Sequence, residues 1–213
     1  MTGTFDTALQ YMNKGFSVIP VRKDKKPCVR WEDHQKQRAD EGKIREWWKR
    51  FPEAGVAIVT GTISGVDVID IDTPEGLDAF LGEIGPIYCP AVISPRGGKH
   101  LYIRSTGEGN KTGFLPHVDF RGQGGYVVAP PSNGTNGKAY AWIQGASIFE
   151  LEPPPGFNDS ILAQAGQLQG LPTRLGKRVR GKVKEFRQVA LRFRPMVQQE
   201  LLNGSFFARS GKG

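Results

Sequence analysis

Residues 64–72 read Ser64-Gly65-Val66-Asp67-Val68-Ile69-Asp70-Ile71-Asp72, a hydrophobic strand pattern that ends in two carboxylates. Side chains alternate along a strand, so Asp70 and Asp72 are expected on one face while Ile69 and Ile71 point into the core. Two like charges side by side are unfavourable unless a cation neutralises them, and carboxylate oxygens favour Mg²⁺ or Mn²⁺. This stretch alone fits a solvated strand end equally well, so the flanking sequence must decide.

The flanking sequence alternates between helical and strand patterns. Apolar residues at helical spacing predict helices over 5–12 and 40–50, and a third helix begins at Thr73-Pro74-Glu75 and stops at Gly85-Pro86. Short apolar runs between glycine turns predict strands over 16–21, 56–59, 66–72, 91–94, 100–103, 118–121 and 126–129. Sequential strands joined by short turns indicate an α+β fold with an antiparallel or mixed sheet.

Composition limits the class of protein. The chain has 213 residues with 38% hydrophobic residues, 28 Gly and 15 Pro, which is typical of a soluble, turn-rich globular protein. Its apolar runs have the length of strands, and the N-terminus lacks a secretory pattern, so we expect no membrane partner and a cytoplasmic protein. Cys28 and Cys89 stand far apart, which excludes a zinc ribbon and favours two reduced thiols.

The positive charge is concentrated at the C-terminal end. Residues 171–213 contain 11 Lys or Arg and two Glu, whereas residues 1–170 contain 18 basic and 19 acidic residues. Such a tail suggests contact with a nucleic acid, although a solvated face of an amphipathic helix explains it equally well. Glu152-Pro153-Pro154-Pro155-Gly156 reads as a domain exit, which divides the chain into a domain over 1–155 and a linker with a basic helical segment over 156–213. The nucleic-acid contacts expected in the tail are Lys177, Arg178, Arg180, Lys182 and Lys184.

A second motif, Ser94-Pro95-Arg96-Gly97-Gly98-Lys99-His100, precedes an apolar strand. Adjacent glycines allow a ligand to approach the backbone, and turn amides with Arg96 and Lys99 can bind an anion. The chain has no Walker motif, so this turn is not a P-loop. His100, taken alone, fits a structural histidine as well as a ligand contact.

A third motif runs from Val118-Asp119-Phe120-Arg121 through Gly122-Gln123-Gly124-Gly125-Tyr126 to Pro130-Pro131-Ser132. Alternation places Asp119 and Arg121 on one face of a strand, as in a charged hairpin that faces water or as in a binding site. Three carboxylates, a basic glycine turn and a histidine together are the components of nucleotidyl transfer assisted by two metal ions.

The three motifs, in this order, closely resemble the bifunctional primase–polymerase (prim-pol) N-terminal domain of the archaeo-eukaryotic primase superfamily, which is typical of plasmids and phages. The resemblance covers about residues 5–155, and Lys26-Pro27, Trp31 and Trp47 are similar to the family's approach to its first motif. It implies an RRM-like sheet packed against a smaller α/β unit, with the active site in the cleft between them.

By this resemblance, Asp70, Asp72 and Asp119 would bind the catalytic metals, Mg²⁺ or Mn²⁺, and His100 would contact the triphosphate of the incoming nucleotide. Further nucleotide contacts would come from Ser94, Arg96, Gly97, Gly98, Lys99 and Arg121. The implied activity is that of a DNA primase and polymerase, which uses dNTPs or NTPs on a single-stranded or primed DNA template. A replicative helicase is a further partner that the resemblance suggests.

Two other classes of function remain open at this point. The basic tail also fits a non-catalytic, nucleic-acid-binding domain of a replication initiator, because contacts to phosphate give affinity without chemistry. A module that only binds polyanions has no use for three converging acids. A metal-dependent nuclease would use the carboxylates, but it gives no reason for the glycine turn and His100.

Overall fold

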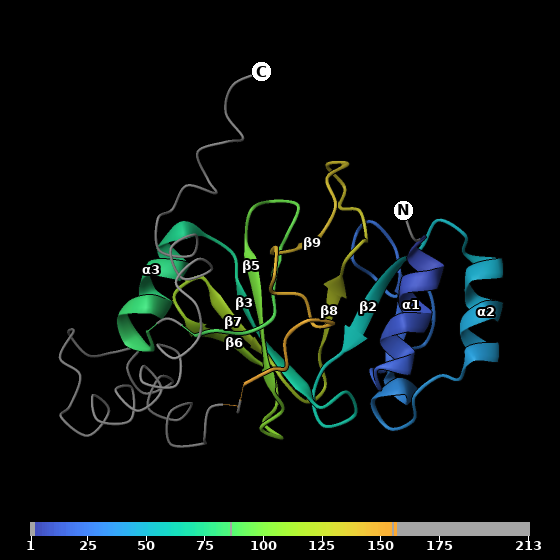
Figure 1. The fold of residues 1–213 in the computed structure, drawn as a ribbon, viewed down its shortest axis with the longest axis horizontal. Helices are drawn as coiled ribbons and strands as arrows, with labels where there is room; N and C mark the ends of the chain where they lie inside the picture. Colours follow the sequence, from blue (N-terminus) through green and yellow to red (C-terminus); the bar gives the residue numbers. More distant parts are fainter. Residues whose placement is uncertain (1–2, 86, 155, 157–213) are drawn as a thin grey trace.

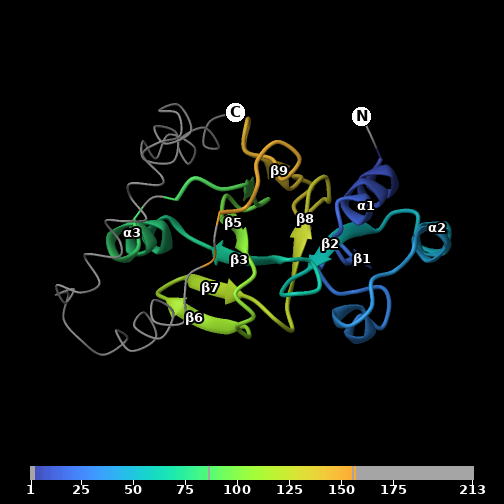
Figure 2. The same cartoon turned by 60° about the horizontal axis from the view of Figure 1, so that its bottom comes forward.

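The computed structural model describes residues 3–85, 87–154 and 156, which form two antiparallel sheets with helices on their outer sides (Figures 1 and 2). The smaller sheet has the order β1-β2-β8, and the larger has the order β6-β7-β3-β5-β4-β9. The α+β class is therefore confirmed. The strands are β1 (Val18–Val21), β2 (Gly55–Val59), β3 (Val66–Ile71), β4 (Ala91–Ile93), β5 (Lys99–Arg104), β6 (Lys111–Leu115), β7 (Val118–Arg121), β8 (Tyr126–Ala129) and β9 (Ala141–Trp142).

The helices begin at residues that satisfy their first free amides. In α2 (Glu41–Arg50), the Asp40 side chain accepts a hydrogen bond from the Lys43 amide at 2.7 Å. In α3 (Pro74–Glu83), Thr73 does the same for Gly76 at 3.2 Å. The first helix, α1 (Thr4–Asn13), packs with α2 beside the smaller sheet, whereas α3 covers the larger sheet, and a short 3-10 helix spans Glu32–Gln35 (Figure 1).

Two hydrophobic clusters hold these layers together. One includes side chains of α1, α2, the smaller sheet and one face of the larger sheet, and the other lies between the larger sheet and α3. Strand β3 contributes to both, because Val66 and Val68 join the first cluster while Ile69 and Ile71 join the second. Trp47 and Trp48 are only 4% and 6% exposed, so these two tryptophans belong to the core.

The structure differs from the predicted elements in two respects. Strand β3 ends at Ile71, so Asp72 lies just beyond the strand rather than within it. Strands β6 and β9 were not predicted. Gly113 interrupts β6 with a φ of +63° and the register shifts between Lys111 and Leu115, while β9 has only two residues, so neither shows a regular alternation.

The predictions for residues 157–213 lie outside the described residues: the basic helical segment after the linker and the five basic residues from Lys177 to Lys184.

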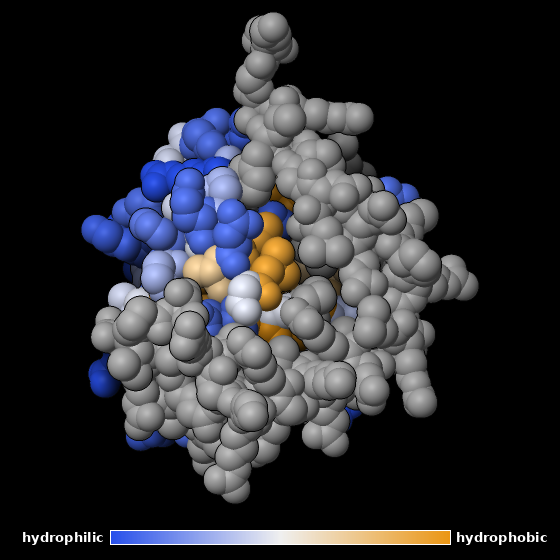
Figure 3. Space-filling view, turned by 90° about the vertical axis from the view of Figure 1, so that its left-hand side faces the viewer, coloured by the Kyte–Doolittle hydropathy of each residue, from blue (hydrophilic) through white to orange (hydrophobic). Residues whose placement is uncertain are grey.

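Seen from the α3 side, the described surface is largely hydrophilic around a small hydrophobic group (Figure 3). Within the described ranges, none of the helices is long and apolar enough to cross a membrane.

Candidate active site

The register of the larger sheet brings three residues from distant parts of the sequence side by side. On β3, Asp70 is the direct Cα partner of His100 on β5 and of Asp119 on β7. Directly opposed residues of antiparallel strands project to the same face. Asp70 therefore lies between an imidazole and a second carboxylate, on the face that is turned toward the smaller sheet.

Arg121 connects the two carboxylates. Its Nη2 donates to Asp119 Oδ2 at 2.7 Å, and its Nε lies 3.4 Å from Asp70 Oδ2. The other oxygen of Asp119 accepts a hydrogen bond from the Gly113 amide at 2.7 Å. Because two like charges on adjacent strands repel each other, this guanidinium stabilises their close approach and fixes their orientation.

His100 stands on the opposite side of Asp70. Its Nε2 lies 3.5 Å from Asp70 Oδ1, and the residue is 5% exposed. Burial lowers the pKa of His100, and the nearby Asp70 charge only partly opposes this. The imidazole is thus neutral at physiological pH, and its buried Nδ1 has no hydrogen-bond partner among the described residues.

Asp72 shares the electrostatic field of the other two carboxylates. Its backbone amide donates to the His117 carbonyl at 3.1 Å, just past the end of β3. Partial desolvation raises the pKa of Asp72, and the charges of Asp70 and Asp119 raise it further, against the effect of Lys25 and Arg121. The charges of Asp70 and Asp119 therefore act on Asp72.

The glycine turn between β4 and β5 packs against the end of β3. The Gly97 amide donates to the Ser94 carbonyl at 2.9 Å and closes the turn. A Cβ atom on Gly98 would lie 2.6 Å from the Ile71 carbonyl oxygen and 3.4 Å from the Asp72 Cα. The absence of a side chain at Gly98 thus allows the turn to approach the carboxylates.

The basic residues of this turn have different positions. Arg96 is exposed and lies near enough to Tyr140 to affect it electrostatically. Burial raises the pKa of Tyr140 to about 12, and the positive charge of Arg96 partly opposes this shift. Lys99 is buried on β5, and alternation places it on the face of Leu101 and Ile103, away from His100. The structure therefore brings Ser94, Gly97 and Gly98 to the end of the site, but it does not bring Lys99 to the His100 face.

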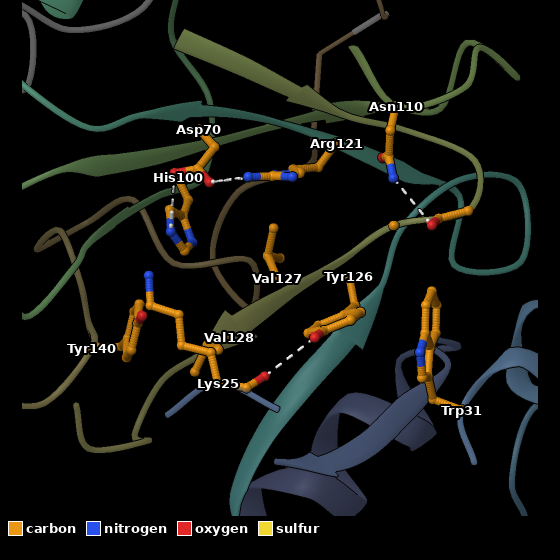
Figure 4. Close-up of a pocket in the computed structure, with 12 residues that line it drawn as sticks. Lys25, Trp31, Asp70, His100, Asn110, Arg121, Tyr126, Val127, Val128 and Tyr140 are labelled. Carbon is orange, nitrogen blue, oxygen red and sulfur yellow. Dashed lines mark hydrogen bonds and ion pairs between the residues drawn. The ribbon is translucent and has the colours of Figure 1, made fainter. Parts of the chain in front are cut away.

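A cavity of about 250 Å³ lies between the two sheets, with Asp70, His100 and Arg121 on one wall (Figure 4). The opposite wall is formed by β8. Tyr140 stands at one end, 5.6 Å from the His100 ring, and Trp31 stands at the other, 4.9 Å from the Tyr126 ring. The remaining lining residues are Lys25, Asn110, Gly124, Gly125, Val127 and Val128.

Asn110 holds the glycine loop at residues 122–125, which follows Arg121, through two hydrogen bonds. Its side chain accepts a hydrogen bond from the Gly122 amide at 3.0 Å and donates to the Gly124 carbonyl at 3.1 Å. A Cβ on Gly125 would lie 2.8 Å from Thr60 Oγ1 and closer still to Asn110 Oδ1, so a side chain there would displace one of these two residues. This loop leads the chain from β7 in the larger sheet to β8 in the smaller one.

Comparison with known proteins assigns the chain to a family. The Prim-Pol family model, described as bifunctional DNA primase/polymerase, N-terminal, matches residues 8–159. The chain belongs to the Prim-Pol family. No curated protein gives a significant match. The Prim-Pol match supports a primase/polymerase-type function in replication, with a DNA template and nucleotide substrates, and it names no helicase.

Prim-Pol domains generally depend on a divalent metal, and the chemical type of the donors near this cavity suits one, although their spacing does not form a metal site here. Three carboxylates with one compensating guanidinium leave excess negative charge, and carboxylate oxygens are the ligands that Mg²⁺ and Mn²⁺ prefer. Across residues 3–154 without residue 86, no three Asp, Glu, His or Cys side chains are gathered closely enough to hold an ion. In this structure Arg121 bridges Asp70 and Asp119 instead.

The sequence interpretation missed several residues of the Prim-Pol cavity. Sequence patterns place Tyr126 and Trp31 in motifs but assign them no role in the site, and they do not mark Lys25, Asn110 or Tyr140 as site residues. A polar loop and a single asparagine carry no pattern that distinguishes them from solvent-exposed residues. Their position becomes apparent only when the two sheets face each other.

Proposed function

We propose that this Prim-Pol domain is a template-directed nucleotidyltransferase that makes or extends DNA primers from nucleoside triphosphates, with Mg²⁺ or Mn²⁺, in plasmid or phage replication. The observation that carries the proposal is the cross-strand arrangement of Asp70 between His100 and Asp119 on the wall of a cavity. A strand of a purely structural sheet gains no stability from two adjacent acids. The family match gives the chemistry that such a site would serve.

In this reaction the 3′-hydroxyl oxygen of the primer attacks the α-phosphorus of the nucleoside triphosphate. A new phosphorus–oxygen bond forms, the bond to the bridging oxygen of the β-phosphate breaks, and pyrophosphate leaves, while the hydroxyl proton passes to solvent. Asp70, Asp72 and Asp119 would hold the divalent cation, which when bound supplies charge stabilisation to the attacking and leaving oxygens. Positioning and charge account for most of phosphoryl-transfer catalysis, so no covalent nucleophile is needed.

The other side chains prepare the site before substrate enters. Arg121 orients Asp70 and Asp119, so less reorganisation is needed in the reaction. His100 is neutral because burial lowers its pKa, and it would therefore offer a hydrogen bond rather than a charge to the triphosphate. Ser94, Arg96, Gly97 and Gly98 lie at the Asp72 end, where we place the phosphates.

Primer extension on a single-stranded template tests the proposal. Asp70→Asn keeps the shape of the side chain but removes its charge, and we expect extension to fall by at least about 100-fold. Asp78→Asn makes the same chemical change at an exposed position of α3 and should leave the rate unchanged. Undiminished synthesis by Asp70→Asn would refute the proposed function.

The alternative is a non-catalytic domain of a replication initiator that retains the fold. It is favoured by one observation, the ion pairs of Arg121 with Asp70 and Asp119, because a guanidinium there satisfies the acids without a metal. Binding of a nucleoside triphosphate that depends on Mn²⁺ distinguishes the two functions. The enzyme requires such binding, whereas the initiator domain does not.

A further inference from the structure

Lys25 reaches the active-site cavity from the smaller sheet. It lies in the loop that follows β1, with a φ of +71°, a conformation that residues other than glycine rarely adopt. The Lys25 amide donates to the Arg22 carbonyl at 2.9 Å, and the Tyr126 hydroxyl donates to the Lys25 carbonyl at 3.3 Å. The loop and β8 thus hold this lysine in a strained conformation, and such strain is concentrated at functional positions.

The charge of Lys25 is not used within its loop. Asp24 Oδ1 lies 3.5 Å from Arg22 Nε, and Asp24 Oδ2 lies 4.0 Å from Lys26 Nζ. The carboxylate of this loop therefore interacts with the two other cations. Among the described residues, no carboxylate lies within 4 Å of Lys25 Nζ, although Asp70 lines the same cavity. Its charge nevertheless lowers the pKa of both Asp72 and His100, so it acts on the site from across the cavity.

The direction of the side chain identifies the part of a nucleotide that it would meet. Figure 4 shows Lys25 extending toward Tyr140 and His100, away from the end of the cavity that Trp31 and Tyr126 form. Arg96 and the glycine turn lie on the Tyr140 side, whereas the aromatic end offers rings against which a base can stack. Positive charge and aromatic surface are therefore separated along the cavity, as the phosphates and base of a nucleotide are.

We propose that Lys25 is a phosphate-binding residue, whose ammonium group contacts the terminal phosphates of the nucleoside triphosphate from the smaller sheet, opposite His100. This inference rests on the proposed function and names a further residue of the same substrate site. An ammonium group makes strong, charge-assisted hydrogen bonds to phosphate oxygens. The triphosphate then joins the two sheets, since His100 belongs to the larger one.

The test measures equilibrium binding of dATP, dADP and dAMP with Mn²⁺ to the full chain and to three variants. Lys25→Asn removes the charge and retains a residue that tolerates positive φ. Lys25→Arg keeps the charge. Lys23→Gln is the matched control, because it removes a charge from the same loop at a residue that does not line the cavity.

We expect the wild-type chain to bind dATP more tightly than dAMP. Lys25→Asn should weaken dATP binding about 10- to 100-fold, the effect of losing one hydrogen bond to a charged group, and leave dAMP binding nearly unchanged. Lys25→Arg should retain most of the dATP affinity, and Lys23→Gln should match the wild type. Equal melting temperatures would show that the variants are folded.

Four results would overturn the inference. Wild-type affinity of Lys25→Asn for dATP would remove Lys25 from the substrate site while leaving the proposed function intact. Equal losses for dATP and dAMP, or an equal loss in Lys23→Gln, would indicate a general effect of charge. If the wild-type chain itself shows no preference for dATP over dAMP, this inference and the proposed function both fail.

Discussion

At the scale of single residues, Arg121 determines how the acids of the site are arranged. Without it, Asp70 and Asp119 would face each other across neighbouring strands with nothing to balance their charge. The Arg121 side chain is 32% exposed, so solvent partly screens its ion pairs. We therefore assign Arg121 chiefly an orienting role and attribute little of the stability of the fold to these pairs.

His100 gives a pH dependence whose direction follows from its burial. Its pKa in the folded chain is below the ordinary value of 6.5, so the unfolded chain binds the proton more readily. The folded state should therefore lose stability as the pH falls below about 6.5, by up to about 1.4 kcal/mol per pH unit for one proton. The free energy of unfolding of the wild type and of His100→Gln, measured by urea denaturation in chelator-containing buffer, checks this.

The difference between the two proteins isolates the contribution of His100, since the other acidic groups titrate in both. The wild type should lose stability more steeply than His100→Gln between about pH 6.5 and 5. Parallel pH profiles would show that His100 takes up its proton as readily in the folded as in the unfolded chain, contrary to its burial in this structure.

The sequence predicted the candidate site residues of the larger sheet, but it did not predict the cavity residues that come from the opposite wall. Alternation along a strand places Asp119 with Arg121 on one face, and this follows from sequence alone. The approach of Lys25 to His100 depends on how two separate sheets face each other. No local pattern contains that information, so the residues of the second wall were found only in the structure.

At the scale of elements, the β4–β5 turn fits closely against β3. Alanine at position 98 would place a methyl group 2.6 Å from the Ile71 carbonyl oxygen, which is too close for either atom. We expect Gly98→Ala to lower the free energy of unfolding by about 1–3 kcal/mol. Because the turn must move away from Asp72, primer extension should also fall. Chemical denaturation and the extension assay measure the two effects.

Gly82→Ala is the matched control for that substitution. Gly82 lies within α3 with open space around the position of a Cβ, so alanine should stabilise the helix by up to about 1 kcal/mol. Wild-type stability of Gly98→Ala would show that the turn does not rest on β3 as described.

The sequence predicted the strands that have a regular pattern, but it did not predict which of the two sheets each strand joins. Strand β8 pairs with β2 in the smaller sheet, although β7, only a few residues before it, lies in the larger one. Tyr126-Val127-Val128-Ala129 reads as a strand whichever sheet it joins. The exchange between sheets occurs at Gly122–Gly125, where the sequence shows only a turn.

At the scale of the whole molecule, one sequence prediction concerns the basic tail. Replacing Lys177, Arg178, Arg180, Lys182 and Lys184 with Gln should weaken binding to single-stranded DNA. It should also flatten the slope of log affinity against log salt, by about 0.7 for each phosphate group that the variant no longer neutralises. Fluorescence anisotropy over a range of salt concentrations measures both quantities. An unchanged slope would mean that these residues do not touch the template.

The strand order of the smaller sheet has a consequence for how the chain folds. Its third strand, β8, follows β3 to β7 in the sequence, so the sheet can be completed only after the chain has passed through five of the six strands of the larger one. Closing such a long loop is entropically costly before the distant residues meet, which favours slow, concerted folding. The two sheets are thus not autonomous modules, because a cut between β2 and β3 would separate β1 and β2 from β8 and would divide the hydrophobic cluster that they share with Val68 and Tyr102 of the larger sheet.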